Sequence, residues 1–460
     1  MKHTPWVQRP FAAALAFFCV CMILLAMRPL LAVDETRYLT VAWEMWNGGS
    51  KIVPHLNGEV YSHKPPLLFW LINIVWLAIG PAEWAARMVA PAAGAVAIMM
   101  TGRLSQTLWP DDDARPGRAA WMLATGGVFL SFGSATMFDT LLTVAVLGGM
   151  LALWSLAQRL SAKAILTLGA ALAFGVLAKG PVVLLHVLPV ALALPLWQPA
   201  PAGRSVMVRY LGSLGLAVLV ALVLVSLWLV PALVFGDAGY RNDILWRQSA
   251  GRMVQSFAHD RPMWFFLALL PLYLWPWGWG REILGIWRRP VLPQVRFLLL
   301  WAGATTLAFS LISGKQIHYL VPVLPAVALL LSGSAVTTRK SWARFLPLLP
   351  AAICVGLGAA VVFRMIPPQQ LDGNSVGATE VALAAGVLAA MSGLVCQNRS
   401  PMAFRALVAP ATLLIVQLIA FQSLWQTNNP ARLAAVLATH ADAGIATVDA
   451  GYAGQFSYSA

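Results

Sequence analysis

Two acidic positions stand out because the other carboxylates of this chain mostly avoid its apolar segments. Asp34 and Glu35 directly follow the first apolar run, and Asp139 has apolar residues on both sides. Ionisable groups beside membrane-like sequence are costly and usually functional. An Asp in such a place can orient or deprotonate a nucleophile, as a general base does. The competing interpretation is that Asp34 and Asp139 each cap a helix N-terminus, where Asp is favoured.

Cationic side chains and histidines occur in the same loops as these acids. Such a cluster suits an anionic, lipid-linked substrate, because Arg and Lys bind phosphate. Individual members also have simpler interpretations: Lys179 fits a short polar break between two apolar runs, and Lys315 and His318 fit anchors at a span end. The set consists of Arg37, Lys51, Lys64, Lys179, Arg241, Arg247, Arg252, Arg261, Lys315, His55, His63, His259 and His318.

The composition identifies the elements that must position these side chains. Of 460 residues, 60% are hydrophobic and 10% are charged, whereas a soluble protein carries roughly 25% charged residues. Long apolar runs recur between residues 11 and 425, and about 20 apolar residues cross a bilayer as a helix. The runs lack the alternation of barrel strands. The sequence therefore predicts an all-α polytopic membrane protein and excludes a soluble fold.

The charge and the cysteines exclude two further kinds of site. The net charge of +14 lies largely in short loops, without a basic stripe interleaved with aromatic residues, so nucleic-acid binding is not expected. The four cysteines lie in apolar runs and form no CxxC pair. Neither a disulfide framework nor a cysteine zinc site is therefore predicted.

The basic loops predict the orientation of the chain. More than half of its 31 Lys and Arg residues lie in segments that the positive-inside rule assigns to the cytoplasm. This assignment places the N-terminus in the cytoplasm, and Asp34, Asp139 and the C-terminus on the outer face. The cytoplasmic segments are the N-terminus and residues 103–118, 158–163, 198–209, 281–296, 339–344 and 397–405.

The segment after the first span is expected to lie at the membrane interface. Residues 66–80 are apolar but too short to cross comfortably, and a crossing here would move the arginine-rich loops outside. Residues 36–47 carry apolar side chains on one helical face and polar ones on the other, as interfacial helices do. We therefore expect a first outer loop over residues 32–83 that holds interfacial helices.

About thirteen transmembrane helices remain. They form one transmembrane domain over residues 1–425, and residues 426–460 form a short outer C-terminal segment, the remnant or the start of a soluble domain. The expected spans are 11–31, 84–108, 119–137, 138–157, 164–179, 181–197, 210–234, 262–280, 297–313, 320–336, 345–366, 377–396 and 406–425.

Several short motifs accompany these elements. The first outer loop contains Asp-Glu-Thr-Arg-Tyr at 34–38, Val-Pro-His-Leu-Asn-Gly at 53–58 and Tyr-Ser-His-Lys-Pro-Pro at 61–66. Ala-Lys-Gly-Pro follows at 178–181, and Ser-Gly-Lys-Gln-Ile-His-Tyr at 313–319 precedes a span. In this combination the chain resembles the bacterial aminoarabinose transferase and dolichyl-phosphate-mannose mannosyltransferase-like family. These are membrane glycosyltransferases of the GT-C fold class, and the resemblance covers most of the chain up to about residue 425.

The resemblance implies transfer of a sugar at the periplasmic face of a bacterial inner membrane. The donor would be a sugar on a polyprenyl monophosphate, typically undecaprenyl phosphate, and transfer would invert the anomeric carbon. The acceptor would be lipid A, another glycan or a protein. Asp34 matches the family's essential first-loop acid, and Asp139 matches a second functional acid. Glu35 is a substrate-binding candidate, although neighbouring helical positions diverge, so only one of Asp34 and Glu35 should face a shared site.

The donor phosphate is expected to meet cations and tyrosines. Arg37, Tyr61 and Lys64 match positions of the family that hold the phosphate. We expect Lys315 and Tyr319 to assist in neutralising the departing phosphate. Surrounding membrane lipids are the other expected partners.

The resemblance also raises the question of a divalent metal, Zn, Mg or Mn. The aminoarabinose enzymes usually have a Glu directly before the Lys-Pro pair, and that Glu helps to bind metal. This chain has His63 there, and histidine can ligate zinc. His63 and His259, in the large outer loop, are the metal-ligand candidates.

A polytopic lipid or solute transporter is the main alternative function. Transporters usually have acids near the middle of their spans, internal repeats or paired broken helices. The sequence has no acid near mid-span and no evident repeat. We therefore predict a membrane glycosyltransferase that uses a lipid-phosphate-linked sugar.

Overall fold

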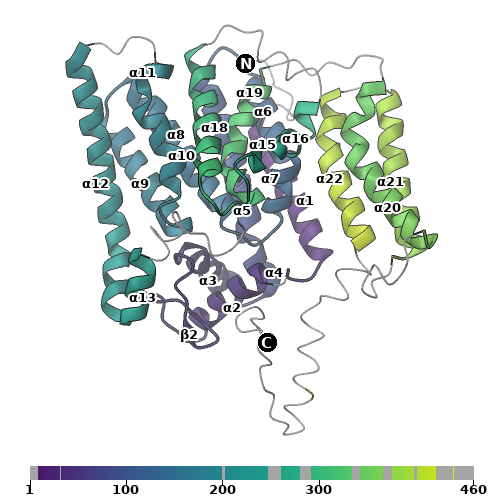
Figure 1. Cartoon of the computed structure of the whole chain (residues 1–460), viewed down its shortest axis with the longest axis horizontal. Helices are drawn as coiled ribbons and strands as arrows, with labels where there is room; N and C mark the ends of the chain where they lie inside the picture. The colour runs from purple at the N-terminus through teal and green to yellow at the C-terminus, as the bar shows by residue number, and fades with distance from the viewer. Residues whose placement is uncertain are drawn as a thin grey trace.

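The chain folds as a bundle of membrane-length helices with a layer of small elements at one end (Figure 1). The computed structural model describes residues 9–31, 33–198, 203–246, 261–279, 292–333, 342–365, 376–397, 401–420 and 439. Apart from Thr439, the predicted C-terminal segment 426–460 lies outside the described residues, and so does the metal candidate His259.

Eight helices in the described part of the chain are long and apolar enough to cross a membrane. Shorter apolar helical stretches accompany them at Pro10–Ala26, Leu67–Ile79, Val183–Leu192 and Ile317–Leu331. The chain is therefore a multi-pass, all-helical membrane protein, as its composition predicts. The eight are Glu83–Leu108, Asp139–Gln158, Ala162–Lys179, Ser205–Phe235, Pro293–Leu311, Arg344–Val362, Ala378–Gln397 and Met402–Ala420.

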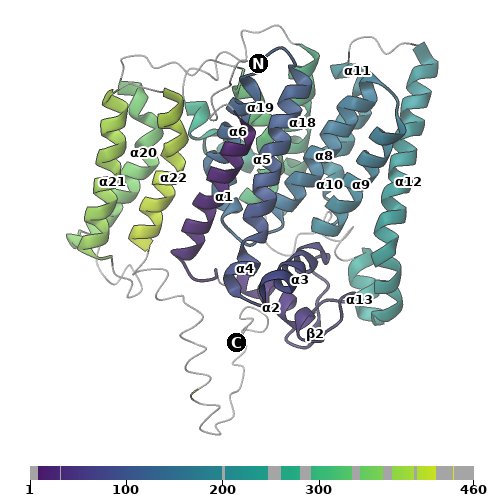
Figure 2. The same cartoon turned by 180° about the vertical axis from the view of Figure 1, so that it is seen from behind.

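The helices of the bundle form three groups (Figures 1 and 2). The central group is α1 (Pro10–Ala26), α4 (Glu83–Arg87), α5 (Val89–Leu108), α6 (Arg115–Ala124), α7 (Gly127–Gly133), α15 (Phe265–Ala268), α16 (Leu270–Leu274), η3 (Trp277–Trp279), η4 (Ile317–Val323) and α19 (Leu324–Leu331). One flank is α8 (Asp139–Gln158), α9 (Ala162–Lys179), α10 (Val183–Leu192), α11 (Leu194–Trp197), α12 (Gly203–Phe235) and α18 (Pro293–Leu311). The other flank is η5 (Trp342–Leu348), α20 (Leu349–Val362), α21 (Ala378–Gln397) and α22 (Pro401–Ala420).

The predicted spans all overlap helix, but some are broken rather than continuous. Residues 119–137 form α6 and α7, which separate at Thr125 and Gly126. At the start of α7, a Cβ on Gly127 would lie 2.1 Å from the ring of Trp275, so only glycine allows this approach. Residues 262–280 form the short α15, α16 and η3, in a segment with several prolines, which cannot continue a helical hydrogen-bond ladder.

The predicted interfacial helices form the layer at the end of the bundle. This layer holds α2 (Asp34–Trp46), a hairpin of β1 (His55–Leu56) and β2 (Glu59–Val60), α3 (Leu67–Ile79) and α13 (Ala238–Asn242) (Figure 1). Asn57 and Gly58 turn the hairpin with positive φ angles of 55° and 79°, as a two-residue hairpin turn requires. The Asn73 side chain on α3 donates to the Ala42 carbonyl of α2 at 2.9 Å, which ties the two helices together.

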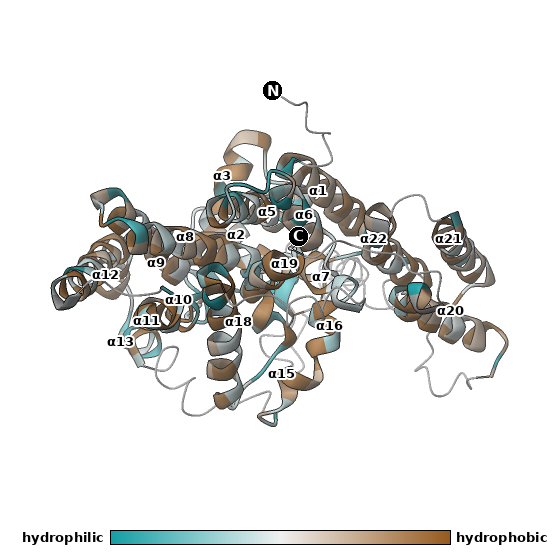
Figure 3. Ribbon diagram, turned by 90° about the horizontal axis from the view of Figure 1, so that it is seen from above, coloured by the Kyte–Doolittle hydropathy of each residue, from teal (hydrophilic) through white to brown (hydrophobic). Residues whose placement is uncertain are grey.

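The ribbons of the peripheral helices are coloured mostly as hydrophobic residues (Figure 3). On α12, for example, Leu219, Leu222 and Val223 are all exposed. Such a surface suits lipid, in which an exposed Leu costs nothing. The helices therefore run across the bilayer, and the α2–α3 layer lies at one membrane face.

Candidate functional site

A buried ion pair lies where α8 begins and α9 ends. The Lys179 Nζ donates to Asp139 Oδ1 at 2.6 Å, and the two side chains are 10% and 1% exposed. An acid at a helix N-terminus and a base at a helix C-terminus each complement the helix dipole. The N-cap position of α8 belongs to Phe138, and Asp139 is the first helical residue, so Asp139 pairs with Lys179 and is not the cap of this helix. Lys179 is likewise more than a polar break between spans.

Asp34 is the first residue of α2 and is half-buried. The N-cap position of α2 belongs to Val33, and the Tyr38 hydroxyl donates to Oδ1 of Asp34 at 3.0 Å. Burial, together with the charge of Asp34, raises the pKa of Tyr38 well above its usual range, so this hydroxyl stays protonated. The Tyr38 ring meets Phe138 edge-on, with centroids 4.8 Å apart. Tyr38 therefore connects Asp34 to the residue directly before Asp139.

Positive charges from three segments surround Asp139. Lys179, His318 and Lys64 all act on its carboxylate electrostatically. The Lys179 Nζ also lies 5.4 Å from the centroid of the Tyr319 ring. The structure thus brings together two of the predicted phosphate-binding residues, Lys64 and Tyr319, around the second acid.

The first outer loop supplies the other predicted contacts. The Lys64 Nζ lies 5.8 Å from the centroid of the Phe138 ring. Tyr61 is buried, with its ring centroid 5.3 Å from that of His63. Arg37 is half-buried on α2, one turn after Asp34. These side chains lie on the same end layer as the two acids.

Glu35 has a different environment from Asp34. Its carboxylate is 1% exposed and receives both terminal nitrogens of Arg28. The backbone amides of Leu31 and Thr136 donate to it at 2.8 and 2.7 Å. Burial alone would raise the pKa of Glu35, but Arg28, with these hydrogen bonds, lowers it below its ordinary value. Protein groups engage both oxygens, so a positioning role fits Glu35 better than the predicted contact with substrate.

Lys315, another predicted phosphate ligand, is held by backbone carbonyls. It is 3% exposed, and its Nζ donates to the backbone carbonyls of Arg261 at 2.8 Å and Ser313 at 3.4 Å. These bonds tie the segment before α15 to the segment after α18. We therefore assign Lys315 a structural role and leave it out of the phosphate-binding set.

Of the two metal candidates, only His63 lies in the part of the chain that is described. No group of three or more His, Cys, Asp or Glu side chains there could hold one ion. His63 is exposed beside Tyr61. We assign no chemical step to a metal.

Three of these side chains were undervalued or missed in the sequence, namely Lys179, Tyr38 and Arg28. For the first two, the sequence contains a pattern that indicates their role. Asp139 opens a 20-residue helix and Lys179 closes the next one, of 18 residues, so an antiparallel pair must bring them to the same end. Tyr38 is four residues after Asp34, a spacing that makes neighbours on a helix. Arg28 had no such signal, because it falls inside the predicted first span, whereas α1 ends at Ala26.

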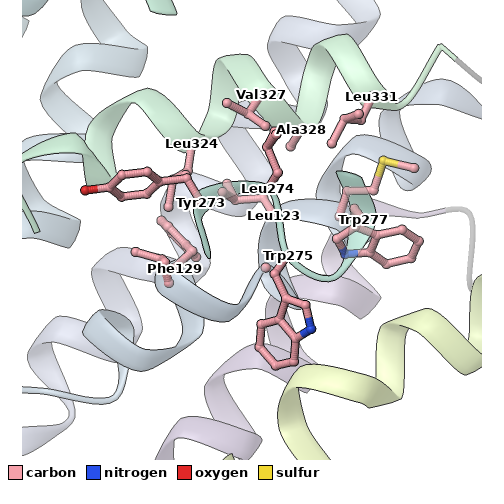
Figure 4. Close-up of a pocket in the computed structure, with 13 residues that line it drawn as sticks. Leu123, Phe129, Tyr273, Leu274, Trp275, Trp277, Leu324, Val327, Ala328 and Leu331 are labelled. Atoms are coloured by element: carbon pink, nitrogen blue, oxygen red, sulfur yellow. The ribbon is translucent and has the colours of Figure 1, made fainter. Parts of the chain in front are cut away.

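An apolar cavity lies elsewhere, between α7, α16, η3 and α19 (Figure 4). Phe129, Tyr273, Trp275 and Leu324 are among its lining residues. It contains none of the predicted site residues, and its lining offers no acid or base. The cavity is therefore separate from the α2–α8–α9 junction, where the predicted acids lie.

Comparison with known proteins supports the same fold. Residues 63–231 match the family described as dolichyl-phosphate-mannose-protein mannosyltransferase. The undecaprenyl phosphate-alpha-4-amino-4-deoxy-L-arabinose arabinosyl transferase 1 of Pseudomonas fluorescens (strain Pf0-1) is 31% identical over 332 residues, which are 70% of this chain and 57% of that protein. The corresponding transferase of Pseudomonas aeruginosa (strain LESB58) is 30% identical over 71% of this chain and 59% of its own length. The chain thus spans less than two thirds of the length of these relatives.

Among solved structures, the crystal structure of ArnT from Cupriavidus metallidurans bound to undecaprenyl phosphate matches with a TM-score of 0.75. The match covers 94% of this chain and 80% of that one at 20% sequence identity. The same protein in the apo state gives a TM-score of 0.68. The two proteins therefore share one polytopic, all-helical fold.

Proposed function

We propose that this chain, an ArnT-like protein of the GT-C fold class, is an inverting glycosyltransferase that takes its sugar from a polyprenyl phosphate. The observation that carries the proposal is the meeting of Asp34, the Asp139–Lys179 pair and Lys64 at one end of the bundle. The relatives are named as arabinosyl transferases of undecaprenyl phosphate-linked aminoarabinose, and undecaprenyl phosphate is bound in the similar structure. The proposed acceptor is lipid A, another glycan or a protein.

The proposed site faces the periplasm of a bacterial inner membrane. The support is the distribution of basic residues: the end of α5 and the turn between α8 and α9 lie opposite the α2–α3 layer (Figure 2), and these segments carry Arg103, Arg159 and Lys163. The positive-inside rule assigns that end to the cytoplasm. The first described turn of α1 lies at that same end (Figure 2), so we infer that the N-terminus is cytoplasmic as well.

The proposed reaction is a single displacement at the anomeric carbon. An acceptor oxygen forms the new glycosidic bond while the bond from the anomeric carbon to the phosphate oxygen breaks. The phosphate departs with the electron pair, and a hydroxyl acceptor gives its proton to Asp34. General base catalysis of this kind contributes about 10²–10⁴-fold. For an acceptor that is itself a phosphate, Asp34 orients the nucleophile and no proton is removed.

The cations of the site neutralise the charge that develops on the departing phosphate. Lys64 and Arg37 belong to the same first outer loop as Asp34, and Tyr61 of that loop and Tyr319 near Lys179 would supply hydroxyl groups. Fixed charges of this kind stabilise a transition state because they need no reorganisation during the reaction. Asp139 keeps Lys179 in a fixed place among them by the buried ion pair.

A reconstituted system tests the proposal. Purified protein in proteoliposomes would receive a panel of radiolabelled polyprenyl-phosphate sugars together with lipid, glycan and protein acceptors. We expect label to appear in one acceptor class with wild type and with Asp111→Asn, an exposed Asp at the opposite end. Asp34→Asn should lower the rate at least about 100-fold. If folded wild type transfers no sugar from any donor, the proposal fails and lipid translocation becomes the function to assay.

The same purified protein can be tested for a bound divalent metal. His63 and His259 stay candidates for Zn, Mg or Mn. Elemental analysis of purified wild type and His63→Ala would show whether a divalent ion copurifies with the protein and depends on His63.

A further inference from the structure

A buried charge network joins the two chain segments that carry the acids of the site. Glu35 directly follows Asp34 in α2. Its Oε1 accepts a hydrogen bond of 2.7 Å from the backbone amide of Thr136, which is three residues before Asp139. One carboxylate therefore holds both acid-bearing segments.

Arg28 completes this connection from the end of α1. Its guanidinium binds both oxygens of Glu35 and donates to the Ser134 carbonyl at 2.7 Å. Both terminal nitrogens of Arg87, on α4, donate at 3.2 Å to the Arg28 carbonyl. A bidentate guanidinium–carboxylate pair fixes orientation as well as distance. The network thus anchors the start of α2 and the segment before α8 to α1 and α4.

The backbone next to Asp34 needs such an anchor. Val33 has φ 76° and ψ −64°, a conformation that a β-branched residue rarely adopts. Strained residues persist only where the surroundings over-determine them, and they cluster at active sites. Here the Leu31 amide donates to Glu35 Oε2 at 2.8 Å, so Glu35 closes the turn around Val33. The direction in which Asp34 leaves the turn therefore depends on Glu35.

We propose that Glu35, Arg28 and Arg87 form a positioning clamp that sets the place of Asp34 relative to Asp139. Glu35 is then a positioning residue and touches neither substrate. Its effect on transfer rests on the proposed function, whereas its effect on the two segments does not. A displacement of about 1 Å at a reacting group can lower a rate about 100-fold, so loosening the clamp should act on kcat.

The kinetic test compares Glu35→Gln with Glu83→Gln. Glu83 pairs with the same Arg87 at 2.8 Å, but its side chain is 53% exposed and it makes no bond to the acid-bearing segments among the described residues. We expect Glu35→Gln to lower kcat about 10- to 100-fold, and Glu83→Gln to leave it unchanged. In both variants the Kd for undecaprenyl phosphate should stay within about threefold of the wild-type value. The reason is that the clamp positions Asp34 and does not contribute to binding of the ground state. Arg28→Lys, which keeps the charge but loses the fork, should give an intermediate kcat.

A second measurement tests the clamp without sugar transfer. In Glu35→Gln, hydrogen–deuterium exchange should become faster both in peptides that contain position 35 and in peptides that contain Thr136. In Glu83→Gln, exchange should stay unchanged in both sets of peptides. Three results for Glu35→Gln would overturn the clamp. They are a kcat equal to that of wild type, a parallel loss of kcat and of affinity for undecaprenyl phosphate, and faster exchange in only one of the two segments. If wild type transfers no sugar, the exchange measurement still tests the clamp. If Glu35→Gln fails to fold, Arg28→Lys replaces it in both measurements.

Discussion

Removing one partner of the Asp139–Lys179 pair should destabilise the bundle more than removing both. The two charged atoms are 2.6 Å apart, and neither side chain is more than 10% exposed, so water screens them little. Asp139→Asn leaves the Lys179 ammonium buried without its counter-charge, and Lys179→Met leaves the carboxylate. Breaking a buried pair in this way costs about 3–5 kcal/mol. Because an unfolded state within a membrane also pairs such groups, we expect about 3 kcal/mol for each single variant.

The double variant Asp139→Asn/Lys179→Met has no isolated charge. Exchange of a buried pair for neutral side chains is often close to neutral. What remains is the loss of two favourable dipole interactions, at the start of α8 and the end of α9, each about 0.3–1 kcal/mol. The double variant should therefore cost about 1–2 kcal/mol, well below the sum of the singles. Both single variants and the double should lack transfer activity.

The measurement is the free energy of unfolding of the four proteins in mixed micelles, titrated with denaturing detergent. Asp112→Asn is the matched control, since the pair of Asp112 with Arg118 is similarly short, at 2.7 Å, but its side chains are 40% and 27% exposed. This exposed pair should contribute about 0–1 kcal/mol. Single variants that cost no more than this control, or a double variant equal to the sum of the singles, would refute the reasoning from burial.

Three further outcomes follow from the site. Tyr38→Phe removes the hydroxyl that donates to Asp34, and a hydrogen bond to a charged group is worth about 1.5–3 kcal/mol. The transfer rate should therefore fall about 10- to 100-fold. The unfolding temperature should change little. Lys64→Met should raise the donor KM about 10-fold or more, whereas Lys51→Met, an exposed lysine of the same layer, should not. The pKa of Glu35 is lowered in the folded protein, so its ion pair stabilises the fold above its ordinary pKa of about 4.3. This stabilisation should be lost as pH falls below that value, and a pH series of thermal unfolding should show a smaller acid loss for Glu35→Gln.

The membrane helices and the end layer could be predicted because hydrophobicity and length decide them. The interfacial α2 and α3 follow from an amphipathic pattern and from an apolar run too short to cross. The break between α6 and α7 could not be predicted, since it depends on a residue far away in the sequence. Gly127 is required there by the approach of the Trp275 ring, a contact that no local pattern reveals.

The site shows the same division between local and long-range information. That Asp34 and Asp139 share one face follows from counting crossings between basic loops. The pairing of Asp139 with Lys179 needs the lengths of two helices, which were predictable to within a few residues. The clamp needs Thr136 to meet Glu35 across 101 residues of sequence, and only the folded chain brings these two together.

The three acids of the site differ in how much of their hydrogen-bonding capacity the protein uses, and this difference assigns their roles. Glu35 receives Arg28 and two backbone amides, and Asp139 holds Lys179 in full burial. Asp34 is half-buried, and in the described residues its carboxylate accepts a side-chain hydrogen bond only from Tyr38. A carboxylate has about four acceptor positions, so Asp34 alone keeps both exposure and acceptor capacity for a hydroxyl of an incoming acceptor. Glu35 and Asp139 are buried in ion pairs and fix geometry, whereas Asp34 keeps exposure and acceptor capacity and can take up a proton.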